Sequence, residues 1–214
     1  MRSHNVSNHS EHAQHLLKSA KRCSDADIGP LLQLYINYLR ILATTQLERH
    51  LRQRVSPSDV VQETLLEAHR DFPQFRGDTA YEFVGWLRKI LVNNVARVVE
   101  RNVQAAKRDV RREVPLSNFQ RNLEQSNARL ENILIDGSAS PLSKVQHHEH
   151  TLLLADALAE MPADYRDVIV LRNLEGLDFN AVAERMDRKS GAVRMLWLRA
   201  MERLRKQLNA IDMG

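Results

Sequence analysis

The chain has 214 residues, 43% of them hydrophobic and 5% aromatic, and its 31 Lys and Arg against 27 Asp and Glu give a formal charge of +4. Few aromatic residues, 7 Gly and 6 Pro favour helices over a strand-and-turn fold. The single cysteine, Cys23, excludes an internal disulfide framework and suits a reducing cytosol. No apolar run reaches signal-peptide or membrane-spanning length, so we expect a soluble cytoplasmic protein without a membrane partner.

The N-terminal half of the sequence predicts a helical module that follows a polar arm. Residues 1–24 are polar and contain four histidines, which suggests a loosely ordered arm. Apolar residues at approximately helical spacing predict one long core helix from Ile28 to Leu51. A second helix is expected to begin at "SPSD" and a third at "TAYE", because both stretches have the residues of a helix N-terminus. In the third helix, Trp86 is expected in the core; the module is predicted to span residues 25–112.

The second half predicts a linker and then another helical module. Between residues 113 and 145 Asn and Ser accumulate and "IDGSASP" interrupts the pattern, which indicates a flexible linker with a short helix at 119–134. Helical periodicity returns in four segments, at about 146–160, 163–174, 179–186 and 190–208, so that the second module is predicted at 146–210. The sequence therefore predicts an all-α fold of two small helical domains joined by a tether.

The stretch "FNAVAERMDRKSGAVRMLWL" fits a helix-turn-helix, with Asp187 in the turn where glycine is common. Asp tolerates the left-handed conformation better than most residues do. One stripe of the second helix is expected to pack on the preceding helices: Val193, Leu196, Trp197, Ala200 and Leu204. The other face is expected in a DNA major groove, where arginine can read guanine, and it carries Arg194, Met195, Leu198 and Arg199. The start of this helix suits phosphate contacts through Arg188, Lys189 and Ser190.

Two adjacent helices of the first module have opposite charge. In the earlier one, Asp59, Glu63 and Glu67 repeat every four residues beside Gln62, a spacing at which like charges repel. This stripe fits a basic partner, although an ordinary solvated face at a helix N-terminus gives the same pattern. The later helix and the residues after it are basic, through Arg97, Arg101, Lys107, Arg108, Arg111 and Arg112.

The stretch "SPSDVVQETLLEAHRDFPQFRGDTAYEFVGWLRKILVNNVARVVER" resembles region 2 of an extracytoplasmic-function (ECF) RNA polymerase sigma factor. The stretch "LADALAEMPADYRDVIVLRNLEGLDFNAVAERMDRKSGAVRMLWLRAMERLRKQL" resembles region 4 of the same family. The short motifs "FRG", "WLRKIL", "NN", "KRDVRREV" and "GAVRMLW" are similar to a planctomycete-type subgroup. The resemblance implies a subunit that directs transcription initiation, without catalysis or a cofactor of its own. Its implied partners are core RNA polymerase and promoter DNA, and an anti-sigma factor is a further candidate.

The resemblance also implies roles for particular residues. The D-x-x-Q-E motif of the family matches Asp59, Gln62 and Glu63. Together with Glu67, these residues are implied to dock on the clamp helices of the largest polymerase subunit. The polymerase flap is the other implied contact. The "FRGDT" loop implies capture of a flipped base of the −10 element, and the −10 set is Arg76, Gly77, Asp78, Thr79, Asn93, Arg97 and Arg101. The −35 set is Arg188, Lys189, Ser190, Arg194, Met195, Leu198 and Arg199. Departures from the family at Arg97, Met195, Leu196 and Leu198 leave the promoter sequence open.

Two other readings remain open at this point. A stand-alone helix-turn-helix regulator, whose first module senses a ligand or dimerises, explains the second module but not the acidic stripe. A metal-binding or enzymatic protein is suggested only by "HHEH" at 147–150, which lacks a neighbouring carboxylate or cysteine cluster. No Ser/His/Asp set or P-loop fingerprint occurs in the sequence.

Overall fold

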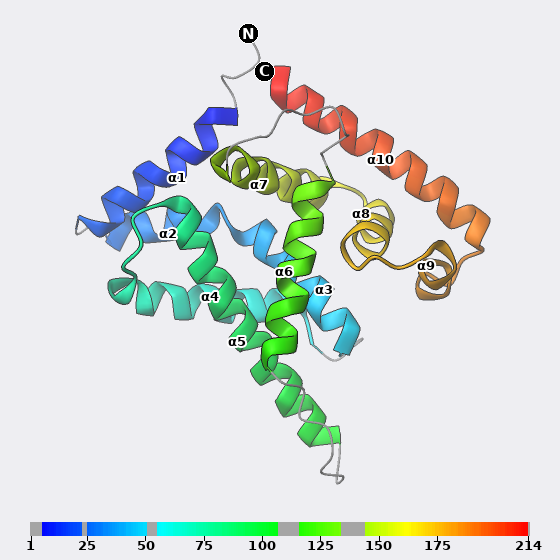
Figure 1. The fold of residues 1–214 in the computed structure, drawn as a ribbon, viewed down its shortest axis with the longest axis horizontal. Coiled ribbons are helices and arrows are strands. Elements are labelled where there is room, and N and C mark those ends of the chain that lie inside the picture. The colour runs from blue at the N-terminus through cyan, green and yellow to red at the C-terminus, as the bar shows by residue number, and fades with distance from the viewer. Residues whose placement is uncertain (1–5, 23–24, 51–54, 107–115, 134–143, 214) are drawn as a thin grey trace. The chain divides into compact units, whose positions relative to one another are not determined.

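The structure, a computed structural model, describes residues 6–22, 25–50, 55–106, 116–133 and 144–213, and these residues form helices and turns without a strand (Figure 1). Two compact units divide the chain: Glu11–Gln125, the N-terminal unit, and one that contains Ser126–Gly214, the C-terminal unit. The all-α fold predicted from the sequence is confirmed. Among the described residues, no helix has the length and apolarity that crossing a bilayer demands.

The N-terminal unit contains four helices of 9 to 16 residues and then one of 27 residues: α1 (Val6–Lys21), α2 (Asp25–Gln33), α3 (Ile36–His50), α4 (Pro57–Asp71) and α5 (Ala80–Ala106). α4 packs against both α3 and α5, and α3 also contacts α5. A short 3₁₀ turn, η1 (Phe72–Gln74), leads from α4 into the loop before α5. The core contains an aromatic cluster beside these helices: Tyr35, Tyr38, Phe72, Phe75 and Phe83.

The expectation of a loosely ordered N-terminal arm is wrong for residues 6–21, which form α1. One side of this helix is buried through four apolar residues at helical spacing: Ala13, Leu16, Leu17 and Ala20. Histidines and other polar residues separate these four positions in the sequence. The composition of the segment is therefore polar, although its apolar residues recur at regular helical spacing. Packing of this stripe stabilises a helix that composition alone does not predict.

The single core helix expected from Ile28 to Leu51 is also wrong, because the chain breaks it into α2 and α3. At the break the Tyr35 amide donates to the Leu32 carbonyl, three residues back, at 3.0 Å. The Tyr35 side chain is fully buried, and its ring meets Phe83 edge-on at 5.5 Å between centroids. The turn contains no Gly or Pro that would predict it from the sequence. The feature found at the turn is instead the tertiary contact between Tyr35 and Phe83.

The predicted helix starts of α4 and α5 are confirmed. Ser56 caps α4 by accepting a hydrogen bond from the Ser58 amide, and Pro57 is the first helical residue. At the start of α5, the Glu82 amide donates to Thr79 Oγ1 at 3.2 Å while the Thr79 amide donates to Glu82 Oε2 at 3.0 Å. This reciprocal pair is a capping box, and it ends the loop before α5 at a defined residue.

The C-terminal unit contains the four predicted helical segments: α7 (Lys144–Glu160), α8 (Ala163–Ile169) with a π-helical turn η2 (Val170–Leu174), α9 (Phe179–Arg185) and α10 (Ser190–Met213). α10 packs against α7, α8 and α9. The predicted short helix of the linker is present as α6 (Leu116–Asn132), and the unit boundary falls within it. Linker residues 113–115 and 134–143 lie outside the described residues, so the linker bounds stay a prediction.

Candidate functional site

The exposed face of α4 carries two carboxylates, an amide and a leucine. Asp59, Gln62 and Glu63 are exposed, and Leu66 has 67% of its surface exposed. Spacings of three and four residues place these four side chains on one side of the helix, which we call the α4 face. The opposite side is buried through Val60, Val61, Thr64 and Ala68.

Sequence reasoning missed Leu66. Its signal is an apolar residue three positions after Glu63, on the acidic side of the helix rather than on the buried side. A single exposed leucine is common on protein surfaces. An exposed leucine within an acidic stripe, however, provides the apolar centre that a protein-binding surface of charged residues otherwise lacks.

Glu67 does not belong to the α4 face. Its side chain is only 14% exposed and pairs with Arg97 of α5, whose Nη1 lies 3.1 Å from Glu67 Oε2. The same Arg97 nitrogen donates to Asn94 Oδ1 at 2.9 Å, and Asn94 in turn donates to the buried Thr64 hydroxyl at 3.3 Å. Two residues that the sequence assigns to different partners therefore form one ion pair between α4 and α5.

The loop Phe75–Thr79 is held by the first turn of α5. The Glu82 carboxylate accepts from the Asp78 amide at 2.9 Å, the Thr79 amide at 3.0 Å and the Thr79 hydroxyl at 2.8 Å. The Thr79 hydroxyl, followed by the two amides, lowers the pKa of Glu82 because these donors stabilise the charged form. The loop backbone is thus fixed at its C-terminal end by a carboxylate that stays ionised at neutral pH.

Gly77 allows the loop to close over Phe75. A Cβ at this position would lie 2.5 Å from Phe75 Cζ and 2.8 Å from Glu82 Cβ, closer than real Cβ atoms approach other heavy atoms. Phe75 itself is buried and its ring packs against Phe83 at 5.4 Å and Trp86 at 5.2 Å between centroids. Only glycine fits between the loop and this aromatic cluster.

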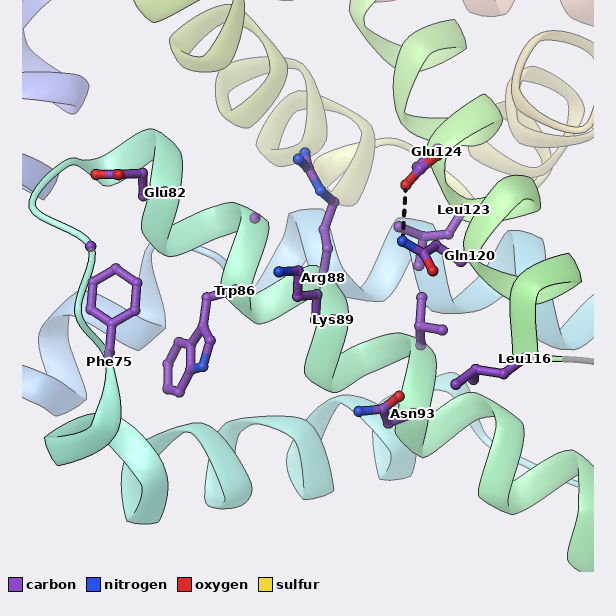
Figure 2. Close-up of a pocket in the computed structure, with 13 residues that line it drawn as sticks. Phe75, Glu82, Trp86, Arg88, Lys89, Asn93, Leu116, Gln120, Leu123 and Glu124 are labelled. Carbon is purple, nitrogen blue, oxygen red and sulfur yellow. Dashed lines mark hydrogen bonds between the residues drawn. The ribbon is translucent and has the colours of Figure 1, made fainter.

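A cavity of about 660 Å³ lies beside this loop, within the usual range for small-molecule sites of about 300–1,000 Å³. Figure 2 shows Phe75 and Trp86 at one end of it, with residues of α6 at the other. The walls combine aromatic rings, cations and amides, and the lining residues include Phe75, Gly77, Trp86, Arg88, Lys89, Asn93, Leu116, Gln120 and Glu124. A planar, polar-edged ligand matches these groups, because rings stack on its faces and amides bond its edges.

The cavity brings together only part of the predicted −10 set. Gly77 and Asn93 line it, while Arg97 and Arg101, further along α5, do not. Arg76, Asp78 and Thr79 are exposed in or beside the loop. Trp86, expected in the core, contacts Phe83 but is only half-buried and also lines the cavity.

The helix-turn-helix is confirmed in the C-terminal unit. Asp187 adopts a positive φ of 51° in the turn, as its place in the motif predicts, and the Arg188 amide donates to the Ala183 carbonyl at 2.9 Å. Asp178 caps α9 by accepting from the Asn180 and Ala181 amides. α10 then leaves the turn with its first residue at Ser190.

The two predicted faces of α10 are also confirmed. Val193, Ala200 and Leu204 are buried, and Leu196 and Trp197 are half-buried. On the other side all four predicted residues are exposed, with Met195 at 51% and Leu198 at 49%: Arg194, Met195, Leu198 and Arg199. The helix therefore presents two arginines and two apolar side chains on one accessible surface.

Aromatic packing fixes the orientation of this surface. The Trp197 indole nitrogen donates to Asn173 Oδ1 at 2.8 Å, and its ring meets Phe179 of α9 edge-on at 5.7 Å. The guanidinium of Arg194 lies 5.2 Å from the centre of the Phe179 ring. Arg172 also lies over this ring, at 4.8 Å. The cation–π contact holds Arg194 near α9 instead of leaving it free in solution.

At the start of α10, Arg188 is paired with Asp164 of α8, and both side chains are about half exposed. Lys189 is exposed and Ser190 is half-buried. Among the described side chains, no group of three or more His, Cys, Asp or Glu residues could hold a metal ion. The side chains of His147, His148 and Glu149 in α7 lie outside that set.

Comparison with protein families places two matches on these two units. The model for Sigma-70 region 2 matches residues 34–105, and the model for Sigma-70, region 4 matches residues 151–204. The first match contains the α4 face, the loop Phe75–Thr79 and α5. The second contains the helix-turn-helix. Helix α1 and helix α6 lie outside both matches.

Three curated proteins with similar sequences are ECF RNA polymerase sigma-E factors. The ECF RNA polymerase sigma-E factor of Haemophilus influenzae is 29% identical over 154 residues, which are 72% of this chain and 75% of that protein. The ECF RNA polymerase sigma-E factors of Escherichia coli (strain K12) and Salmonella typhimurium (strain LT2) are each 32% identical over 145 residues. These cover 67% of this chain and 69% of the relative.

Proposed function

The chain belongs to the ECF family of RNA polymerase sigma factors, and from this membership we propose how its surfaces divide the work of transcription initiation. Membership places it with core RNA polymerase and promoter DNA, in a family that is not a class of enzymes. The observation that supports the proposal best is the cavity beside the loop Phe75–Thr79, because it joins aromatic walls with amides and cations.

The α4 face is proposed to bind the clamp helices of the largest polymerase subunit. Its two carboxylates match a basic partner, and burial of Leu66, which is 67% exposed, supplies about 1–2 kcal/mol of apolar stabilisation. Glu67 acts indirectly, since its ion pair with Arg97 fixes α4 on α5. The C-terminal unit is proposed to contact the polymerase flap. An anti-sigma factor that covers the α4 face is a further proposed partner. A cytoplasmic location is also proposed, because the protein is proposed to act together with polymerase.

The cavity is proposed to hold a base flipped out of the −10 element. Unstacking a base costs a few kcal/mol, and stacking on aromatic rings returns about 1–3 kcal/mol per base. Phe75 and Trp86 provide such rings, Asn93 provides an amide for the base edge, and Lys89 provides a cation for the phosphate. Arg97 and Arg101 lie further along α5, where they are proposed to follow the strand.

The exposed face of α10 is proposed to read the −35 element in the major groove. Arg194 and Arg199 are long enough to reach base edges, while Met195 and Leu198 are proposed to contact thymine methyl groups. Lys189 and Ser190, at the start of the helix, are proposed to contact phosphate beside the first backbone amides, and Arg188 joins them if it leaves Asp164. The planctomycete-type subgroup stays a prediction from the sequence motifs.

Run-off transcription with cognate core polymerase and a promoter library tests this function. We expect transcripts only when the protein is added, from promoters that share one −10 and one −35 element at a fixed spacing. A protein that binds DNA tightly and specifically without polymerase, and that supports no run-off product, would instead be a stand-alone helix-turn-helix regulator. The selected promoters also reveal both elements, which the sequence leaves open.

Replacement of Arg199 by alanine is expected to relax the preference at one base pair of the −35 element. Loss of a base-reading arginine costs about 1–3 kcal/mol at that position. The measurement is the affinity of holoenzyme for −35 variants, with Arg203→Ala as the matched control, because Arg203 is exposed one turn later on the same helix. Equal weakening on all sequences would mean that Arg199 contacts phosphate.

A further inference from the structure

The loop Phe75–Thr79 is held from two directions. Glu82 holds it from α5, as described above, and two side chains of α1 hold it from outside the region 2 match. These two, Gln14 and Lys21, lie 57 to 66 residues away in sequence from the loop residues they contact. The contacts all lie within the N-terminal unit.

Gln14 bridges the backbone at the end of the loop. Its Nε2 donates to the Asp78 carbonyl at 2.7 Å, and its Oε1 accepts from the Ala80 amide at 2.9 Å. A primary amide is needed for this bridge, because one end must donate and the other must accept. A glutamate would turn a carboxylate oxygen towards the Asp78 carbonyl. The two backbone groups flank Thr79, whose own amide is bonded to Glu82.

Lys21 contacts both the side chain of the loop and the wall of the cavity. Its ammonium lies 2.6 Å from Asp78 Oδ1 and 5.6 Å from the centre of the Phe75 ring. The Asp78 side chain is 88% exposed, so that this ion pair alone contributes little stability. The position of the Lys21 ammonium over the Phe75 ring is the more important contact for the shape of the cavity, because it links the aromatic wall and the loop to the same helix, α1.

Both side chains come from a rigid element. The stripe Ala13, Leu16, Leu17 and Ala20 is buried, which fixes α1 in the N-terminal unit on either side of Gln14. Gln14 itself is half-buried, while its neighbours His15 and Lys18 are exposed. The amide of Gln14 therefore reaches the loop from a packed helix and not from a mobile tail.

We propose that α1 positions the base-capture loop, with Gln14 as the principal positioning residue and Lys21 as the second. The loop and the cavity then keep their shape before DNA arrives, so that less binding energy is lost in ordering them. This inference rests on the proposed role of the cavity in −10 recognition. Under this proposal α1, whose polar sequence predicted only a loosely ordered arm, contributes to promoter selection.

The experiment measures discrimination by holoenzyme at each element separately. Run-off rates are compared between the preferred promoter and versions with single substitutions in the −10 or the −35 element. Gln14→Ala is expected to lower −10 discrimination by about three- to tenfold, the effect of one or two lost hydrogen bonds, and Gln14→Glu at least as much. Discrimination at the −35 element is expected to stay at the wild-type value, as is the affinity for core polymerase.

Matched variants of α1 separate positioning from general stability. His15→Ala and Lys18→Ala alter exposed neighbours on the same helix and are expected to behave as wild type. Lys21→Ala is expected to reduce −10 discrimination, and Lys21→Arg is expected to retain it, because Arg keeps the charge and the contact with the Phe75 ring. The melting temperature of each variant shows whether a loss follows from unfolding.

Three results would overturn the proposal. The first is wild-type −10 discrimination in both Gln14 variants, which leaves the function of the cavity intact. The second is an equal loss at both promoter elements, which follows from destabilisation of the whole chain. The third is a wild-type holoenzyme that does not discriminate at the −10 element; this outcome removes the proposed function of the cavity together with the role of α1.

Discussion

The double substitution Asp59→Ala with Glu63→Ala is expected to weaken binding to core RNA polymerase by about two orders of magnitude. Truncation of one partner of a hydrogen-bonded charge pair that is buried in an interface costs about 2–5 kcal/mol. Both side chains are exposed on α4, so their loss leaves the packing of the N-terminal unit unchanged. The measurement is a titration of labelled protein with core polymerase, together with the melting temperature of the free variant.

A matched control removes the same charge elsewhere in the N-terminal unit. Glu11 and Glu100 are exposed on α1 and α5, away from the α4 face, and Glu11→Ala with Glu100→Ala is expected to bind polymerase like the wild type. Equal weakening in both double variants would show that net charge, rather than a docking surface, governs the association. Unchanged affinity in the Asp59 and Glu63 variant would move the polymerase contact away from α4.

Gly77→Ala is expected to lower −10-dependent initiation by at least tenfold and to cost about 1–3 kcal/mol of stability. The added Cβ would lie 2.5 Å from the Phe75 ring, which is held between Phe72, Phe83 and Trp86. Either this ring moves into the cavity or the loop moves away from Glu82. The measurements are the run-off rate on the preferred promoter and the free energy of unfolding in urea.

Gly29→Ala is the control for this substitution, because no atom lies within 4 Å of a Cβ at Gly29 in α2. It is expected to leave transcription unchanged and to change stability little, because the higher helix propensity of alanine is opposed by the contact of its Cβ with Pro30, the next residue of α2. If the Gly77→Ala variant discriminates at the −10 element as well as the wild type does, the shape of the loop does not determine which base is selected. Binding to core polymerase is expected to be the same in both glycine variants.

Local signals in the sequence predicted a large part of the fold. The caps at Ser56 and Thr79, the stripe on α10 and the positive φ of Asp187 all depend on residues within one or two turns of each other. Periodicity and capping chemistry therefore sufficed for the starts of α4 and α5, for the helix-turn-helix and for the exposed arginines of α10. The resemblance to sigma regions 2 and 4 added the role of the loop and a partner for the acidic stripe of α4.

Long-range contacts account for what the sequence did not predict. The pair Glu67 and Arg97 joins residues 30 positions apart, and Gln14 meets the loop 64 to 66 positions away. No local pattern encodes such a contact. Charge alone placed Glu67 with the acidic stripe and Arg97 with the DNA-binding residues, whereas the fold directs each towards the other. The turn at Tyr35, which lacks Gly or Pro, was hidden for the same reason.

The ion pair between Glu67 and Arg97 joins α4, the helix proposed to bind polymerase, to α5, the helix proposed to bind DNA. If polymerase on the α4 face shifts α4 and breaks this pair, Arg97 keeps its hydrogen bond to Asn94 and can turn its second nitrogen towards a DNA phosphate. Thermodynamic linkage then requires the reverse: DNA that engages Arg97 would strengthen the binding of polymerase to the α4 face by the same factor. One surface pair can thereby make promoter affinity depend on whether the protein has already joined the enzyme.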